Sequence, residues 1–342
     1  MMNVVSPDRG TAESSSSAAA WPTDIPACGR HSYRHVEHPP GDGLMPWLAL
    51  LTGSGLHAVI TALLGLSMIT AADSLLILAI AASASAVLGA VAARRYPSCA
   101  PAGAPVVRSL GWLNLWTAVT LVALLLGVAV YSAVVVFTLG ASIAPLAITA
   151  WSVVEARRGQ AATGLGLVQR VAVCLLAVLG ALLVVVLAGS DARGPVAMLV
   201  AAVLGVIDGT AAGGVAVVSR NLARNGVGVW QVMAHRYYAT VVVAATALLV
   251  LVPAGLLAAP TLSLRTAIGA AFASLVVPFF LMQYAIQRLA PVLVTAALAL
   301  IPAIALFVEM AVGRAVNWPA LLLGLLIVPA SLAIFFTRRQ PA

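Results

Sequence analysis

Ionisable side chains are rare in the long apolar segments of this sequence, and two of them could do chemistry there. Asp208 lies about midway along the apolar segment 195–218, and His57 lies about midway along the segment 45–67. A charged side chain at the centre of a bilayer costs about 2.5–3.5 kcal/mol on insertion scales, so it needs a partner, a hydrated cavity or a function. We expect Asp208 to face a central cavity, and the alternative is a structural hydrogen bond to a neighbouring helix.

Asp208 and His57 could face each other if the segments that carry them are related by an internal repeat. An imidazole changes its charge near physiological pH, so it could exchange a proton with a nearby carboxyl group. This pair therefore suggests protons as the coupling ion. The alternative is that His57 is a packing residue that neighbouring helices satisfy.

Other amphipathic side chains could line the same cavity. Gln283 is informative, because an amide deep in an apolar segment must bond to protein, water or a bound solute. For the tryptophans near the ends of their segments, an aromatic belt at the membrane interface is the alternative. The further candidates for a substrate pathway are Asn114, Trp112, Trp116, Trp151 and Tyr284.

Three charged residues lie at the ends of apolar segments. Arg236 precedes the seventh segment, where it could attract an anionic substrate, although the retention of positive charge on the cytoplasmic side explains it equally well. Glu155 and Glu309 close their segments near the interface, where a carboxylate can reach water. We interpret both glutamates as capping or gating groups.

Prolines inside apolar segments predict bends. A proline removes one backbone hydrogen bond, and irregular backbone at membrane depth is tolerated only where protein or a hydrated cavity satisfies it. Pro278 and Pro302 are therefore predicted gating points. Pro145 falls at the position equivalent to Pro302 in an internal repeat, which predicts a paired kink in the fourth and ninth segments.

The composition indicates that these segments are membrane helices. Of the 342 residues, 62% are hydrophobic and 8% are charged, whereas soluble domains carry about 25% charged residues. The chain has no lysine, which excludes Schiff-base chemistry and the lysine of a phosphate-binding loop. The net charge of +8 comes from scattered arginines and not from a basic patch, so nucleic acid is not an expected partner.

The sequence predicts an all-α, polytopic fold with about ten transmembrane helices. Each apolar segment has roughly the 20 residues that cross a bilayer as a helix. Residues 1–43 are polar and are expected to form a disordered cytoplasmic tail, and residues 338–342 a short cytoplasmic C-terminal tail. The expected spans are 45–67, 74–93, 110–130, 134–154, 171–189, 195–218, 237–259, 266–287, 290–310 and 317–337.

The positions of the arginines test the number of spans, because cytoplasmic loops retain positive charge. With ten spans and cytoplasmic termini, only Arg193, Arg265 and Arg314 of the 18 arginines fall on the outer side. A missed or an invented span would invert every later loop. The sequence therefore predicts a multi-pass protein of the plasma membrane with both termini in the cytoplasm.

The chain contains a weak internal repeat. TLGASIAP at 138–145 aligns with TAALALIP at 295–302, and an apolar stretch ending in a glutamate follows each copy. Two repeats of five spans each, 45–189 and 195–337, must have opposite orientations because five is odd. Inverted repeats of this kind are a common basis of alternating-access transporters.

Over residues 45–337 the chain resembles the drug/metabolite transporter superfamily, specifically its EamA-like members. The second half carries the resemblance best, with AAVLGVID at 201–208, SRNLAR at 219–224, WQVMAHR at 230–236 and YAIQRLAP at 284–291. The first half departs from the pattern, because its second segment has no arginine matching Arg236. The long N-terminal tail is additional to the usual form.

The resemblance implies a secondary active exporter or importer of a small metabolite such as an amino acid, and we expect an exporter. The alternative is a flippase of the same fold that moves a lipid or a lipid-linked intermediate. No clustered acids, histidines or metal motif indicates an enzyme, and Cys28, Cys99 and Cys174 fit no metal or disulfide pattern. No cofactor is expected. The expected partners are a small-molecule substrate, protons and the lipid bilayer, and a homodimer is one of the assemblies that the sequence allows.

The expected topology predicts the sides of two positions. Reporter fusions at Ser190, after five spans, and at Ala342, after ten, should report opposite sides of the membrane. Reporters on the same side would contradict the inverted arrangement of the halves.

Overall fold

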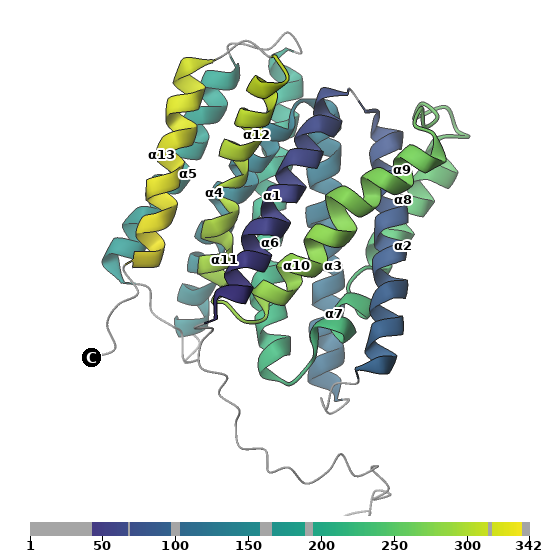
Figure 1. Cartoon of the computed structure of the whole chain (residues 1–342), viewed down its shortest axis with the longest axis horizontal. Coiled ribbons are helices and arrows are strands. Elements are labelled where there is room, and N and C mark those ends of the chain that lie inside the picture. The colour runs from purple at the N-terminus through teal and green to yellow at the C-terminus, as the bar shows by residue number, and fades with distance from the viewer. Residues whose placement is uncertain are drawn as a thin grey trace, which may run out of the picture. The chain divides into compact units, whose positions relative to one another are not determined.

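The structure is a computed structural model that describes residues 43–67, 69–96, 103–157, 166–188, 194–313 and 317–336. Over these ranges the chain is helical and contains no strand, which confirms the all-α prediction (Figure 1). Among these described residues, nine helical segments are long and apolar enough to cross a membrane, and Trp318–Ile334 is a shorter apolar helix. The described chain is therefore that of a polytopic membrane protein. The predicted tails 1–43, apart from Gly43, and 338–342 lie outside the described residues.

Apart from the seventh, the helices follow the predicted segments to within several residues, and three of the segments are divided. The undivided helices are α1 (Leu44–Leu66), α2 (Ala71–Arg95), α3 (Ala104–Val130), α4 (Ala133–Arg157), α5 (Leu167–Ala188), α6 (Pro195–Arg224) and α13 (Trp318–Phe336). The divided segments are α7 (Val229–His235) with α8 (Tyr238–Leu251), α9 (Leu264–Ala271) with η1 (Phe272–Val276) and α10 (Val277–Ile286), and α11 (Pro291–Leu298) with α12 (Ile301–Ala311).

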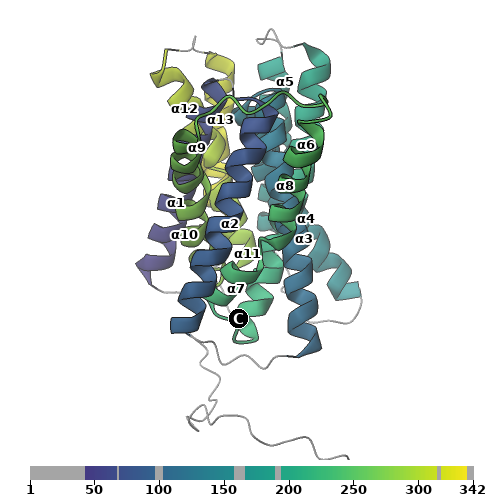
Figure 2. The ribbon, with the colours of Figure 1, turned by 90° about the vertical axis from the view of Figure 1, so that its right-hand side faces the viewer.

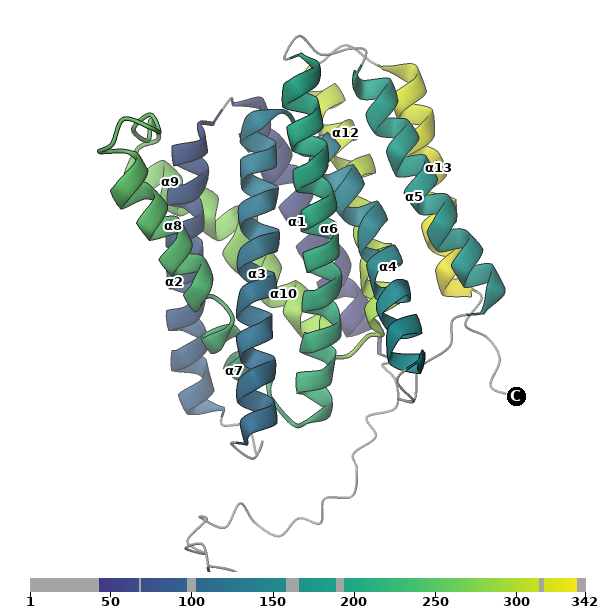
Figure 3. The same cartoon turned by 180° about the vertical axis from the view of Figure 1, so that it is seen from behind.

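Helices from the two halves of the chain alternate in the bundle. The helix α6 packs between α3 and α4, and α1 packs against α10 and α12 (Figures 1 and 3). On one side α2 packs against α7 and α8 (Figure 2), and on the other side α5 packs against α13 (Figure 3). These contacts place the middle of α1 and the middle of α6 inside the bundle.

The seventh segment begins earlier than the expected range 237–259. It starts at Val229, is interrupted at Arg236 and Tyr237, and ends at Leu251. The end is set by Pro253 and by Gly255, whose φ of +70° favours glycine. The interruption has no proline or glycine of its own, so the local sequence did not indicate it. Arg236 consequently lies inside this segment and not in front of it.

Two further segments are irregular near prolines. The chain forms a π-helix at Phe272–Val276, and Pro278 stands in the first turn of the helix that follows. The ninth segment is interrupted at Ala299 and Leu300, directly before Pro302 in the first turn of α12. By contrast, α4 continues through Pro145 without interruption. The prolines therefore divide the later helices and leave α4 whole.

A glycine stripe allows α6 to approach α4 closely. A Cβ atom at Gly205 would lie 2.9 Å from the Leu139 Cβ, and one at Gly213 would lie 3.1 Å from the Ala144 carbonyl oxygen. At Gly209 it would overlap the backbone of Gly140. Spaced small residues mark close helix packing in membranes, and the structure confirms this for α6.

One buried carboxylate joins the loop after α8 to the start of α2. Asp73 forms a capping box with Thr70 and has no exposed surface. Its oxygens also accept bonds from the Thr261 N–H at 2.7 Å, the Thr261 hydroxyl at 2.8 Å and the Leu262 N–H at 2.9 Å. A carboxylate with several N–H and O–H donors is strongly stabilised. Sequence analysis missed this residue, because its partners lie far away along the chain.

This contact predicts a loss of stability on Asp73→Asn. Asparagine has one acceptor oxygen and no charge, so it cannot satisfy all these donors. Hydrogen bonds to charged groups are worth about 1.5–3 kcal/mol each, and we expect a clear drop in the apparent melting temperature in detergent. Ser67→Ala is the control, because the exposed Ser67 hydroxyl bonds only the Leu64 carbonyl. Equal melting temperatures for both variants would contradict the role of Asp73.

Candidate functional site

A cavity of about 100 Å³ lies among helices of both halves. Its polar lining residues are His57 from α1, Thr120 from α3, Asp208 from α6, Arg236 from the interruption between α7 and α8, and Thr295 from α11. Apolar side chains form the rest of the wall, and they include Leu121, Leu124, Phe137, Ala144, Val215, Phe279, Met282, Ile286, Val294, Leu298 and Ile301. The cavity is thus mostly apolar with a few ionisable groups, which is typical of binding sites for small molecules.

Asp208 reaches the cavity from the middle of α6. Its carboxylate accepts a hydrogen bond from the Thr120 hydroxyl, which also lies 3.2 Å from the Asp208 backbone oxygen. On the opposite side stands Gly140 of α4, where a Cβ atom would overlap the carboxylate. Because Gly140 has no side chain, α4 leaves room for the Asp208 carboxylate. The close approach of α4 and α6 then fixes the depth of Asp208.

His57 is oriented by the π-helix. Its Nδ1 lies 2.7 Å from the Ser274 carbonyl oxygen, and a carbonyl oxygen can only accept, so Nδ1 carries the proton. In the neutral ring Nε2 is then an acceptor. The ring packs against Phe137 and Phe279, with centroids 5.3 and 5.2 Å away. A π-helix shifts the backbone hydrogen-bond pattern, and here it places a carbonyl at His57.

The two residues expected to form a proton relay share the cavity without a direct bond. Each has its own partner, Thr120 for Asp208 and Ser274 for His57. Both side chains are almost fully buried, at 8% and 3% exposure. Proton exchange between them would therefore pass through water or a bound solute in the cavity.

Arg236 is the cationic group of the cavity. It is 4% exposed, its Nε donates to the Thr117 hydroxyl at 3.2 Å, and one terminal nitrogen donates to the Gln283 Oε1 at 2.5 Å. The guanidinium carbon lies 5.1 Å from the centroid of the Tyr237 ring. Arg236 lies seven residues after Val229, which is about 10 Å along the segment at a helical rise of about 1.5 Å per residue. It is therefore a buried residue and not one of a loop.

Asn114 supports the interruption that carries Arg236. Its amide donates to the His235 carbonyl, and its Oδ1 accepts from the Ala239 N–H at 3.2 Å. A broken helix leaves backbone groups without intrahelical partners, and this side chain satisfies two of them. Asn114 was predicted to line the pathway, whereas the structure places it behind the cavity wall.

The remaining predicted pathway residues lie away from the cavity. Gln283 is fully buried and contacts the cavity through Arg236 alone. The guanidinium carbon of Arg288 lies over the Tyr284 ring, 3.7 Å from the centroid of the ring. The tryptophans form an aromatic cluster beside α6, where the Trp116 ring packs against Gly214. The centroid of the Trp116 ring lies 6.2 Å from that of Trp112 and 6.4 Å from that of Trp151.

The two glutamates expected at the interface differ from each other. Glu309 is 9% exposed inside α12, so it is buried and does not face water. The side chain of Glu155 lies outside the described residues. A role for Glu309 as an exposed cap is therefore not supported.

Sequence reasoning overlooked the hydroxyl groups of the site. Thr117 and Thr120 stand three residues apart on α3, so they share one face and hold Arg236 and Asp208 respectively. Thr295 lines the cavity from α11. The spacing of Thr117 and Thr120 was a signal for a polar face, but threonines are common enough in membrane helices that the signal is weak.

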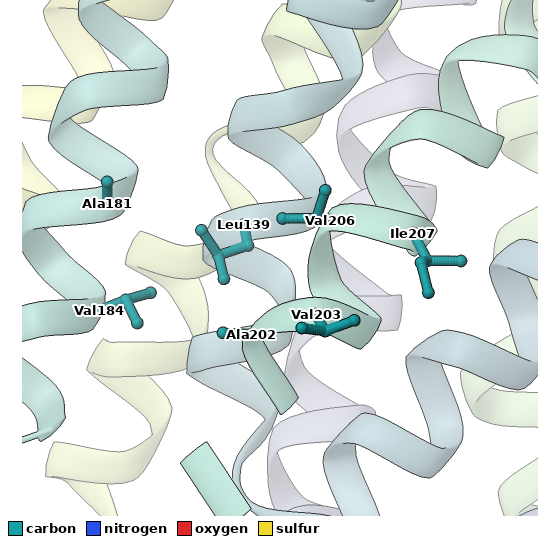
Figure 4. A pocket seen from close by; sticks show the side chains of 7 residues that line it. All are labelled: Leu139, Ala181, Val184, Ala202, Val203, Val206 and Ile207. Carbon is teal, nitrogen blue, oxygen red and sulfur yellow. The ribbon is translucent and has the colours of Figure 1, made fainter. Parts of the chain in front are cut away.

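A second pocket differs in its chemistry. It has a volume of about 370 Å³ between α4, α5 and α6, and apolar side chains alone line it (Figure 4). Its lining residues are Leu139, Ala181, Val184, Ala202, Val203, Val206 and Ile207. Val203 is 51% exposed, so this pocket is a groove on the surface of the bundle. It offers no polar group to a ligand.

Comparison with known proteins establishes the fold alone. No protein-family model and no curated protein sequence matches the chain. A solved structure named "Crystal structure of protein" matches with a TM-score of 0.58 and 17% sequence identity, and the match covers 86% of this chain and 99% of that one. The fold of this chain is thus similar to an experimentally observed fold over nearly the whole length of that solved chain.

Proposed function

We propose that the chain is a secondary active transporter, in the export direction, of a small metabolite that passes through the central cavity by alternating access. The observation that carries the proposal is a cavity inside a membrane bundle that brings together His57, Asp208 and Arg236. Burying three ionisable groups among apolar helices is costly. A solute pathway accounts for all three, whereas packing alone accounts for none. The proposal includes that the protein is not an enzyme and that it works in the plasma membrane with both termini in the cytoplasm.

The neighbour relations of the helices support an inverted repeat of the drug/metabolite transporter type. An exchange of the halves would relate α1 to α6, α3 to α10, and α4 to α12. Accordingly α3 and α4 pack on α6, while α10 and α12 pack on α1. The same exchange relates α5 to α13, which pack on each other. We propose on this basis ten spans, with α13 as the tenth, and membership of the EamA-like group.

The dimensions of the cavity favour a small solute over a lipid. Sites for drug-sized ligands have volumes of about 300–1,000 Å³, and this cavity of about 100 Å³ is smaller. The larger groove beside α5 has no polar lining group that could hold a lipid headgroup. Transport of a small metabolite therefore accounts for the polar groups better than lipid flipping does.

Polar contacts join neighbouring segments at both ends of the bundle. At one end Asp73 holds the loop after α8. At the other end the Arg220 guanidinium donates to the Gln287 carbonyl, and the Gln287 amide donates to the Val227 carbonyl at 3.5 Å. We propose that opening one end breaks one set of contacts while the other set holds, as alternating access requires.

The proposal predicts solute uptake by reconstituted protein. We expect proteoliposomes containing the full chain to accumulate at least one class of small solute saturably, when amino acids, amines, sugars and organic acids are screened with and without a proton gradient. If Asp208 carries the coupling proton, Asp208→Asn should abolish stimulation by the gradient while solute counterflow persists.

Glu309→Gln is the control for this experiment, because Glu309 is a buried acid that does not line the cavity. Its variant should keep the response to the gradient. Unchanged pH-dependent uptake in Asp208→Asn would remove the coupling role. Transbilayer movement of fluorescent phospholipid without uptake of any solute would favour the flippase instead.

A further inference from the structure

Among the described residues, the hydrogen-bond partners of the buried Arg236 include no carboxylate. Its two hydrogen-bond partners, Thr117 and Gln283, are both neutral. In the part of the chain that the structure describes, no carboxylate bonds to it, and Asp208, the acid of the cavity, is bonded to Thr120. A guanidinium keeps its charge at any physiological pH. The cavity therefore contains a permanent cation to which no carboxylate of the described residues is bonded.

The free donors of Arg236 are of the kind that binds a carboxylate. A guanidinium has five N–H donors, of which Nε uses one and one terminal nitrogen uses one. The remaining N–H groups belong to the two terminal nitrogens, and this end of the fork pairs with two oxygens of a planar anion. Because Arg236 lines the cavity, a solute there is the partner within reach.

The rest of the site orients the guanidinium. Thr117 holds its Nε, Gln283 holds one terminal nitrogen, and the centroid of the Tyr237 ring lies 5.1 Å from its central carbon. Asn114 fixes the backbone on both sides of Arg236. A long side chain that is fastened in this way loses little further entropy when it binds an anion. The arrangement is thus preorganised for a ligand.

We propose that Arg236 binds the carboxylate of the cargo and that the cargo is a small monocarboxylate with an apolar body. This inference rests on the proposed function. One guanidinium matches one negative charge, and the described lining of the cavity offers no second permanent cation for another, which disfavours phosphates and dicarboxylates. The body of the cargo would lie against Phe279, Met282, Leu298 and the other apolar wall residues.

Ligand-induced stabilisation of the purified full chain in detergent tests this proposal without requiring transport. The probes are isobutyrate, isobutyramide and isobutylamine, with benzoate, benzamide and benzylamine as a larger set. A ligand that binds only the folded state raises the melting temperature, and we expect at least one carboxylate at saturation to raise it by about 5 °C. The amide and the amine of the same skeleton should not do so.

Variants of Arg236 separate binding from a structural role. In Arg236→Gln the carboxylate effect should disappear, while the ligand-free protein melts at the same or a higher temperature, because an unneutralised buried charge has been removed. Arg236→Lys keeps the charge but loses the fork, so a weaker carboxylate effect should remain. Arg288→Gln is the matched control and should respond like the wild type, because the exposed Arg288 lies over Tyr284 outside the cavity.

Three outcomes would overturn the proposal. They are stabilisation by the amines and not by the carboxylates, an undiminished carboxylate effect in Arg236→Gln, and no effect of either carboxylate on the wild type. A large fall in the melting temperature of ligand-free Arg236→Gln, with no carboxylate effect in Arg236→Lys, would assign Arg236 a structural role instead. Uptake of a non-carboxylate solute in proteoliposomes would leave the transporter standing while the carboxylate site fails.

Discussion

The cost of burying charge among apolar helices determines how the interior of this protein is built. Asp208, His57 and Arg236 lie in one small cavity, and each needs a hydrogen-bond partner that the helices around it must supply. A regular helix has no free backbone groups to offer. The structure supplies the partners from threonines on α3, from a π-helix that places the Ser274 carbonyl at His57, and from Gln283 on α10. Irregular backbone and ionisable groups therefore occur together.

The apolar helical segments and their order along the chain could be predicted because they follow from local properties. Apolar length and the distribution of arginines locate the spans, and the spacing of Gly205, Gly209 and Gly213 indicates the face of α6 that packs on α4. Asp208 and His57 could be found because an ionisable residue in an apolar segment is conspicuous. These features need no knowledge of which helices are neighbours.

The remaining features depend on contacts between distant parts of the chain. The interruption at Arg236 has no proline or glycine, and Asn114, over a hundred residues earlier, satisfies its backbone groups. From the sequence Asp73 is an ordinary capping residue, and only the folded chain brings Thr261 and Leu262 into hydrogen-bond contact with it. For the same reason Arg236 was assigned to the end of a segment, where positive charge is expected. The structure shows it buried, so retention of positive charge at the interface no longer explains it.

Within the described residues the irregular helices all belong to the second half of the chain, and this asymmetry limits how the cavity can change shape. The helices α3, α4 and α6 are continuous, and Gly209 and Gly140 lock α6 against α4, so Asp208 stands on a rigid unit. Arg236, Ser274 and the Ala299–Leu300 interruption stand on divided segments, whose joints can absorb changes in backbone angle. Motion of α7 to α12 against that rigid unit would change the distance between the cation and the acid, and it would do so without disturbing the glycine contacts that set the depth of Asp208.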